Sequence, residues 1–421
     1  MLIIQHSGPA VKGGTDAYAL HIMVRCFDLR PLPRRESRVT RLTDRVRIGV
    51  QRRALRLLHA RGRRRPSAVE AAEPSIVRLG ERLRAAALHE NRGRFAATRW
   101  RLLLCTPPSI AAEVWFTDLE TGMRHAGVPV TRLPALVTVD AALLDQFRPN
   151  VVVALDHESA LRGIDLAALR EHKRRHGCLR LFVAMRDDIF APGALSEGEA
   201  RRLQRAIDGD GADAFLSLYE PELFPRAYRP WADAGFRCVS VPQSGNPIED
   251  QPRDVPRVHD YFYASMATAA RVRATWSELR SIVRRHRGDW AGDGWGFGGG
   301  PVSFADMPVR YGASRIALAP LLPALRRDAF ELTHRVFEAA ACGAFQITSL
   351  SPITRRYFSE RALVGASDGR ELVRHFEHFV HRPDERHRIA EQALEELYAG
   401  HTVFHRVEAL LASLDSLASR V

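Results

Sequence analysis

Residues Glu331–Phe358 carry the sequence ELTHRVFEAAACGAFQITSLSPITRRYF, and this stretch decides the fold of the chain. Its first part has the pattern of a short helix, Gly343 is a typical helix stop, and Phe345–Thr348 has the apolar composition of a short buried strand. In such a unit, free backbone N–H groups and the positive end of the helix dipole meet at the start of the helix and bind anions. The stretch therefore predicts a parallel α/β sheet with a diphosphate site at one edge.

Three side chains near the start of the predicted helix fit such a site. Arg335 can pair with phosphate oxygens in two-point fashion. Glu338, one turn further, can accept hydrogen bonds from ribose hydroxyls, and His334 can reach a phosphate or a sugar hydroxyl. The alternative is that Arg335 and Glu338, three residues apart, form only a helix-surface ion pair worth about 0.2–0.5 kcal/mol.

The same alternation of strand and helix extends over most of the chain. From Arg99 onward, short apolar runs such as Val151–Asp156 and Cys178–Met185 alternate with helical segments, a pattern typical of a parallel sheet covered on both faces. The polar, proline-rich stretch Ser244–Pro256 then separates this series from a second one. We predict an α/β fold with two Rossmann-like, doubly wound domains facing a cleft, over residues 99–250 and 255–421.

The N-terminal part of the chain differs in composition. Residues 1–100 hold 22 basic and 8 acidic residues, a surplus of +14 within a total of +13, so the rest of the chain is close to neutral. We predict that residues 1–98 form a basic, loosely structured extension that can contact an anionic membrane surface through its arginines and interleaved apolar residues. Nucleic acid is not an expected partner, because no aromatic residues are interleaved for base stacking. Deleting residues 1–95 should leave the melting temperature nearly unchanged.

The C-terminal half resembles a known family in several motifs. RVFEAAACGAFQIT is similar to an R-x-F-E-aliphatic-small-x-G helix–strand core, and His401, Thr402 and Arg406 fit a His-Thr-x-x-x-Arg ending. Upstream, GWGFGGGPVSFADMPVRYGASRIALAP has the expected order of glycine loop, tyrosine and strand. Over residues 255–415 the chain thus resembles the spore-maturation-type glycosyltransferases, which carry a group-1 glycosyltransferase C-terminal module and have the GT-B architecture.

The resemblance implies roles for matching positions. It places the sugar-nucleotide donor in the C-terminal domain and the acceptor in the N-terminal domain. Arg335 and Glu338 would hold the diphosphate and the ribose, with His334, Gly300, Tyr311 and Gly343 completing the donor site. Related retaining enzymes have two glutamates separated by seven residues, whereas Glu331 and Glu338 have six between them. Retention or inversion of the anomeric centre therefore stays open.

Catalytic residues are expected in the N-terminal domain at the carboxyl ends of parallel strands, where doubly wound sheets bind their ligands. His157 follows one predicted strand, and Asp187 and Asp188 follow the next, at a position where the resembled family often has an aspartate. An imidazole or carboxylate there can take the proton of an acceptor hydroxyl. The alternative for each residue is a helix cap or a solvated loop position.

Neither a metal nor a cofactor is expected. The triplet Asp208-Gly209-Asp210 mimics the metal-binding DxD of another transferase architecture, but it follows an arginine-rich helix and is better explained as a solvated loop. The five cysteines are scattered without a metal-ligand spacing, which favours reduced thiols in the cytoplasm. No run of about 18–20 apolar residues is present to span a membrane, so any membrane contact would be peripheral, on the inner face.

The predicted function is a glycosyltransferase that moves a sugar from a nucleotide-sugar donor, its substrate, to a hydroxyl of a glycan or another acceptor in the interdomain cleft. Two alternatives remain open: a GT-B-like sugar-nucleotide epimerase, and a non-catalytic module that binds sugar nucleotides or glycans. The donor base, the sugar and the acceptor do not follow from fold-level analogy.

Overall fold

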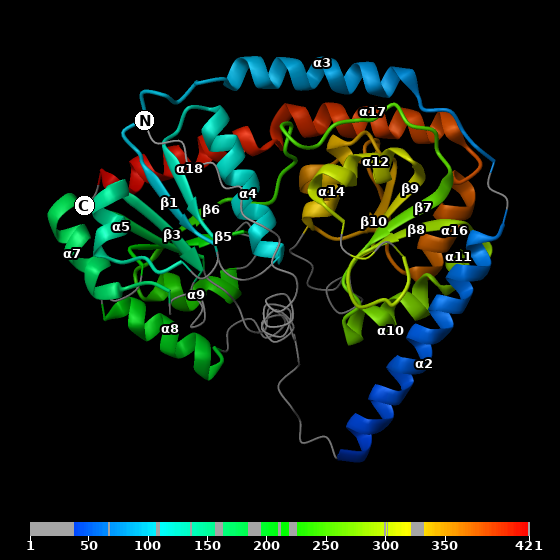
Figure 1. Ribbon diagram of the computed structural model, residues 1–421, viewed down its shortest axis with the longest axis horizontal. Helices are drawn as coiled ribbons and strands as arrows, with labels where there is room; N and C mark the ends of the chain where they lie inside the picture. Colours follow the sequence, from blue (N-terminus) through cyan, green and yellow to red (C-terminus); the bar gives the residue numbers. More distant parts are fainter. Residues whose placement is uncertain are drawn as a thin grey trace, which may run out of the picture.

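Two parallel β-sheets lie side by side in the computed structural model, each with helices packed on it (Figure 1). The structure describes residues 38–65, 68–106, 110–134, 137–155, 163–183, 195–208, 212–218, 225–298, 300, 302–320 and 332–419. The predicted pair of doubly wound α/β domains is confirmed.

The first sheet has the strand order β2-β1-β3-β4-β5-β6, with every neighbouring pair parallel. Its strands are β1 (Leu102–Cys105), β2 (Val130–Leu133), β3 (Val151–Leu155), β4 (Leu179–Val183), β5 (Ala214–Ser217) and β6 (Arg237–Ser240). The order reverses between β1 and β3, and a doubly wound sheet binds its ligands at the carboxyl ends of such a strand pair. The expected catalytic residues of this domain follow β3 and β4 in the sequence.

The helices of this domain begin and end where their sequences provide caps. They are α4 (Ile110–His125), α5 (Ala141–Phe147), α7 (Leu166–His176), α8 (Glu197–Ile207) and α9 (Pro225–Asp233). Asp165 accepts hydrogen bonds from two backbone N–H groups at the start of α7, and Gly177 ends that helix in the left-handed conformation with φ 68°. Ser196 and Glu199 form a capping box at α8.

The second sheet has the order β11-β10-β9-β7-β8 and repeats the topology of the first. Its strands are β7 (His259–Ala264), β8 (Gly288–Ala291), β9 (Ser314–Ala319), β10 (Gln346–Ser349) and β11 (Val364–Ala366). The helices are α10 (Ala269–Glu278), α11 (Arg280–Arg285), η2 (Phe304–Asp306), α12 (Met307–Gly312), α14 (His334–Ala341), α15 (Thr354–Tyr357), α16 (Gly369–Phe379) and α17 (Pro383–Gly400). The strands β8 and β11 were not predicted, because their sequences GDWA and VGA contain glycine or aspartate, which are depleted in strands.

Both ends of the chain differ from the predicted division into domains. Within the segment expected to be loose, α2 (Arg38–Arg63) and α3 (Pro74–Asn91) are helices, and their buried residues Leu55, Ile76 and Leu79 belong to the hydrophobic core of the C-terminal domain. The last helix, α18 (Val403–Ala418), packs against α4 and β6 of the N-terminal domain. Apolar residues on one face of each helix drive this docking. The prediction of a dispensable extension is therefore wrong, because deletion of residues 1–95 would expose the C-terminal core and lower the melting temperature.

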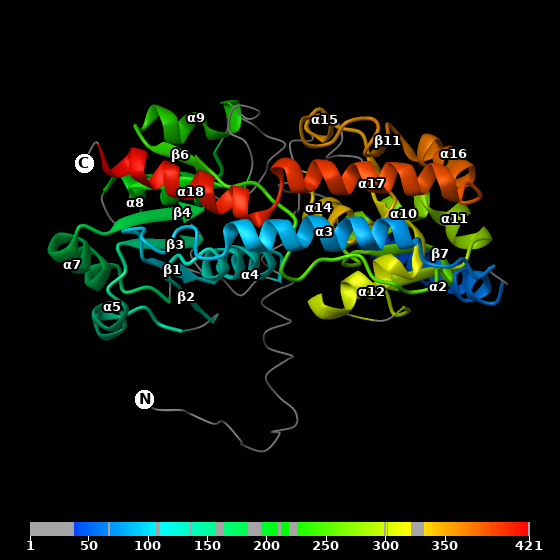
Figure 2. The same cartoon turned by 90° about the horizontal axis from the view of Figure 1, so that it is seen from above.

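Within the described residues, the chain crosses between the domains at three places. Helix α3 lies along one edge of the molecule beside α17 and spans the boundary (Figures 1 and 2). The other two crossings are the linker after β6 and the junction of α17 with α18, and they pair through a parallel bridge between Gly245 and Thr402. The guanidinium of Arg84 on α3 donates to the carbonyl oxygens of Pro247 and Ile248 in the linker, which ties all three crossings together.

Candidate functional site

The helix α14 joins β9 to β10, and its first turn faces the N-terminal domain. Thr333 precedes the helix in an extended conformation (φ −66°, ψ 149°), and no side chain caps the N-terminus. The imidazole Nδ1 of His334 lies 3.6 Å from Oδ2 of Asp118 on α4. The helix therefore points its free backbone N–H groups into the boundary between the domains, as the anion-site prediction requires.

Glu338 and Tyr311, both expected at the donor site, are brought together by the structure. Glu338 lies on the second turn of α14 with 4% of its surface exposed, and Tyr311 on α12 is equally buried. The Tyr311 hydroxyl donates a hydrogen bond to Oε2 of Glu338 at 2.9 Å. A single oriented carboxylate thus stands one turn behind Arg335.

Arg335 itself is half-buried on the first turn of α14. No ion pair joins it to Glu338, although both residues are in the described part of the chain, so the predicted alternative of a surface pair is not what the structure shows. Its charge still acts on the neighbourhood, because it opposes the rise in the pKa of Glu338 and lowers that of His334.

Asp118 was not anticipated from the sequence, yet it forms the opposite wall of the site. Its Oδ1 accepts a hydrogen bond from the side-chain amide of Asn246 at 2.8 Å, and the same amide donates to Thr121 at 3.0 Å. Asn246 belongs to the interdomain linker, and its backbone N–H donates to the Asp250 carboxylate. The only sequence signal is an acid among the buried apolar positions of an amphipathic helix, beside Trp115, Phe116 and Leu119.

Burial removes charge from most of the titratable groups around α14. It raises the pKa of Asp118 to about 8, against a hydrogen bond from Asn246 and with help from Glu338. It raises the pKa of Glu338 to about 7, although the Tyr311 hydrogen bond and Arg335 oppose this. The pKa of His334 falls to about 4, through burial and then through the charge of Arg335. Near neutral pH, Arg335 and the helix dipole therefore supply positive potential at the N-terminus of α14, while Asp118 is mostly protonated and Glu338 is only partly ionised.

The two glycines expected at the donor site occupy turns that follow α14 and β8. Gly343 follows the opposite end of α14 with φ 64°, and a Cβ there would come 2.5 Å from the side chain of Ile76 on α3. This position requires glycine for the turn and for the close approach of α3. Gly300, with φ 67°, accepts a backbone hydrogen bond from Gly292 and closes the glycine-rich loop after β8.

The expected catalytic residues His157, Asp187 and Asp188 lie outside the described residues. The strands that precede them in the sequence, β3 and β4, are parallel neighbours in the first sheet. Of the triplet Asp208-Gly209-Asp210, only Asp208 is described; it caps the end of α8 and accepts a hydrogen bond from Gln204.

The His-Thr-x-x-x-Arg ending lies at the junction of α17 with α18. His401 packs against the rings of Phe337, Tyr357 and Phe358 at centroid distances of 5.1–6.3 Å. Arg406 donates to the carbonyl oxygen of Gln243 in the linker, and the Thr402 side chain caps α18. These contacts position the crossing between the domains.

Comparisons with known proteins agree with this geometry. Residues 271–412, about a third of the chain, match the family described as glycosyl transferase-like. No curated protein is detectably similar in sequence. Among solved structures, a sucrose-phosphate synthase from Thermosynechococcus elongatus aligns over 76% of this chain and 99% of its own, with 11% identity and a TM-score of 0.52. A glycosyltransferase from Rickettsia africae aligns over 77% of this chain and 100% of its own, with 9% identity and a TM-score of 0.53.

The family match and the structural similarities agree on the fold and on the kind of region that the C-terminal domain carries. The chain has the GT-B fold, and its C-terminal domain carries a glycosyl transferase-like region that includes α14 and its first turn. These comparisons support the expected class of enzyme, a glycosyltransferase. They do not identify the spore-maturation subtype. No helix in the described part of the chain is both long and apolar enough to cross a membrane.

Proposed function

We propose that this protein transfers a sugar from a nucleotide-sugar donor, bound at the N-terminus of α14, to a hydroxyl of a glycan or another acceptor. The main support for this proposal is the position of the first turn of α14, which carries Arg335 and faces Asp118 of the other domain. The family match over the same helix supports this reading. We further propose the spore-maturation-type subgroup, supported by the His401–Arg406 ending, and a location on the cytoplasmic side.

Two measurements test the proposal. A thermal-shift screen with UDP-, GDP- and dTDP-sugars identifies the donor, because a ligand at 100 times its dissociation constant adds about 2.7 kcal/mol of stability. Release of nucleoside diphosphate only in the presence of an acceptor supports transfer. Interconversion of the sugar would instead support an epimerase, and binding without turnover a non-catalytic module.

In this mechanism the helix terminus and Arg335 stabilise the negative charge that develops on the departing diphosphate. An acceptor oxygen attacks the anomeric carbon and loses its proton to a base of the N-terminal domain. We propose His157, Asp187 and Asp188 for that role, because they follow the adjacent parallel strands β3 and β4. We also propose that no divalent cation is needed at the diphosphate, so chelation should leave the rate unchanged.

Glu338 is expected to contribute to donor binding rather than to the chemical step. Its loss should raise the donor Michaelis constant about 10- to 100-fold, the scale of a hydrogen bond to a charged group, with a smaller change in kcat. Tyr311→Phe removes the hydroxyl that orients Glu338 and should change the same constant in the same direction. Initial rates against donor and acceptor separate this from a folding defect, which lowers the apparent kcat through the fraction of active enzyme and leaves both Michaelis constants unchanged. Unchanged donor kinetics in both variants would remove Glu338 from the site.

Asp118 is expected to make donor binding weaken at alkaline pH. Its pKa of about 8 keeps it protonated near neutral pH and charged above, where the carboxylate faces the diphosphate site and repels the donor. The groups around it are His334, which is neutral in this range, the carboxyls of Glu338, Glu249 and Asp250, and the amide of Asn246. The donor Michaelis constant should therefore rise through pH 8 in the wild type and much less in Asp118→Asn. Parallel profiles for the two proteins would contradict this role.

The outer face of α2 supports contact with an anionic membrane. Val46, Val50 and Leu57 are 59–65% exposed and follow one another along one face of the helix, among exposed arginines. The opposite face, with Leu55 and His59, packs on the C-terminal domain, and the first half of α2 projects from the body (Figure 1). A helix that packs on the domain through one face and exposes apolar residues and arginines on the other has the properties of an interfacial membrane anchor.

Sedimentation with vesicles tests the anchor. Vesicles containing phosphatidylserine should carry the wild-type protein down, and neutral phosphatidylcholine vesicles should not. Replacing Val46, Val50 and Leu57 by serine should abolish sedimentation without changing the melting temperature, because these side chains are exposed in the free protein. Equal binding of the variant, or binding to neutral vesicles, would contradict the proposal.

A further inference from the structure

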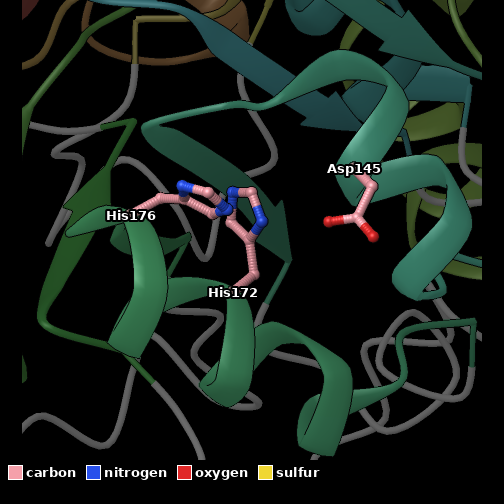
Figure 3. A group of neighbouring side chains, drawn as sticks. All are labelled: Asp145, His172 and His176. Carbon is pink, nitrogen blue, oxygen red and sulfur yellow. The ribbon is translucent and has the colours of Figure 1, made fainter.

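One carboxylate and two imidazoles meet on the N-terminal domain, far from α14. Asp145 lies on α5, and His172 and His176 lie four residues apart on α7. One ligand atom from each residue lies within 4.8 Å of the others. Figure 3 shows the Asp145 carboxylate facing the two rings across the gap between the helices. Tetrahedral coordination with bonds of about 2.0 Å places ligand atoms about 3.3 Å apart, which small rotations of the exposed Asp145 and His176 side chains can reach.

His172, the buried histidine of this group, is oriented by a hydrogen bond to a backbone carbonyl, as histidine metal ligands usually are. His172 is 3% exposed, and its Nε2 lies 2.8 Å from the carbonyl oxygen of Pro149. A carbonyl only accepts, so Nε2 carries the proton and the Nδ1 of the neutral ring keeps a free lone pair. That Nδ1 is buried and has no hydrogen-bond partner. An imidazole that donates one N–H to a backbone carbonyl and keeps its other nitrogen free is held in the orientation that histidine metal ligands commonly adopt.

The local charges also favour a cation. His176 is the last residue of α7, where the negative end of the helix dipole lies. Three basic residues at the end of α7 are paired with carboxylates: Arg174 and Arg175 bind Glu171, and Lys173 binds Asp213. Asp145 accepts no hydrogen bond from the described residues and leaves its carboxylate exposed.

We propose that Asp145, His172 and His176 bind a divalent first-row transition ion, with Zn²⁺ the best match to two nitrogen ligands and one carboxylate oxygen. The ion would join α5 to α7 over the core that contains Leu144 and Leu169. Because both helices lie at the outer end of the N-terminal domain, away from the other domain, the site is structural and does not depend on the proposed transfer reaction (Figure 1).

Metal binding to the full-length protein tests the proposal. The chelator-treated wild type is titrated with Co²⁺, read by its visible absorption, and with Zn²⁺, read by calorimetry and melting temperature. We expect one high-affinity ion per chain, a rise in melting temperature with Zn²⁺, and no such rise with Mg²⁺. His176→Ala and Asp145→Asn change exposed side chains, so both variants should fold and should each lose at least about 10- to 100-fold in affinity. His381→Ala, an exposed histidine of the other domain, is the matched control and should bind like the wild type.

Several results would overturn it. Absence of tight binding to the wild type would do so, as would undiminished affinity in both His176→Ala and Asp145→Asn. An equal loss in the His381→Ala control would show that the ion binds elsewhere. Turnover of the chelated protein stays a separate readout, so failure of the transfer assay leaves this test intact.

Discussion

Arg335→Ala is expected to lower kcat about 10²–10³-fold, the scale of removing one positioned electrostatic donor. The guanidinium stands on the first turn of α14, where the pKa of His334 is lowered to about 4, so this imidazole is neutral near pH 7 and supplies no positive charge to the departing diphosphate. Because the negative charge of the diphosphate develops in the transition state, the loss should appear in kcat more than in the donor Michaelis constant.

Two further variants sharpen this result. Arg335→Lys keeps the charge but loses the two-point geometry, so it should fall between wild type and alanine. Arg361→Ala removes an exposed arginine of the same domain and should behave as wild type. If Arg335→Ala kept the wild-type rate with an intact circular-dichroism spectrum, the donor phosphates would have to bind elsewhere.

Glu70→Ala should destabilise the protein by about 3–5 kcal/mol, the cost of leaving a buried charge without its partner. Glu70 lies between α2 and α3 and receives two hydrogen bonds of 2.6 and 2.7 Å from Arg386, whose side chain is 1% exposed. Arg257 and Arg315 also pair with this carboxylate. Its removal leaves three guanidinium groups close together without a central anion.

The Glu70 carboxylate also makes the free energy of unfolding depend on pH in the acid range. Burial alone would raise the pKa of Glu70, but the hydrogen bond to His387 and the charge and hydrogen bonds of Arg386 outweigh it and lower the pKa to about 2. The stabilisation is therefore present above the unfolded value of about 4.5 and is lost as the pH falls from there toward 2. Urea unfolding at pH 7 and pH 3 measures both effects. Glu81→Ala, on the exposed face of α3, should stay within about 0.5 kcal/mol of wild type, and an equally small effect of Glu70→Ala would contradict the network.

The predictable part of this molecule is what local sequence controls. The α14 unit, the alternation of strands and helices and the linker after β6 follow from periodicity, glycine and proline, and all of them recur in the structure. The positions of α2 and α3 do not follow, because an arginine-rich amphipathic helix has the same local pattern whether it docks or not. Leu55 and Glu70 find their partners more than 180 residues away.

The residues of the candidate site show the same division between features that local sequence encodes and contacts that only the tertiary structure brings together. His334, Arg335 and Glu338 were predicted from their positions on one helix, and Tyr311 from the resemblance. Asp118 and Asn246 come from a different helix and a linker, and only the tertiary structure brings them to α14. Their contribution to the site is a matter of long-range contact, which spacing along the chain does not encode.

The three crossings between the domains lie along one edge of the molecule and are joined to one another by backbone and side-chain hydrogen bonds (Figure 1). Asp118 is hydrogen-bonded to one of these crossings through Asn246, and His334 lies 3.6 Å from Asp118. The N-terminus of α14, the proposed phosphate site, is therefore connected by direct contacts to the segments that join the two domains.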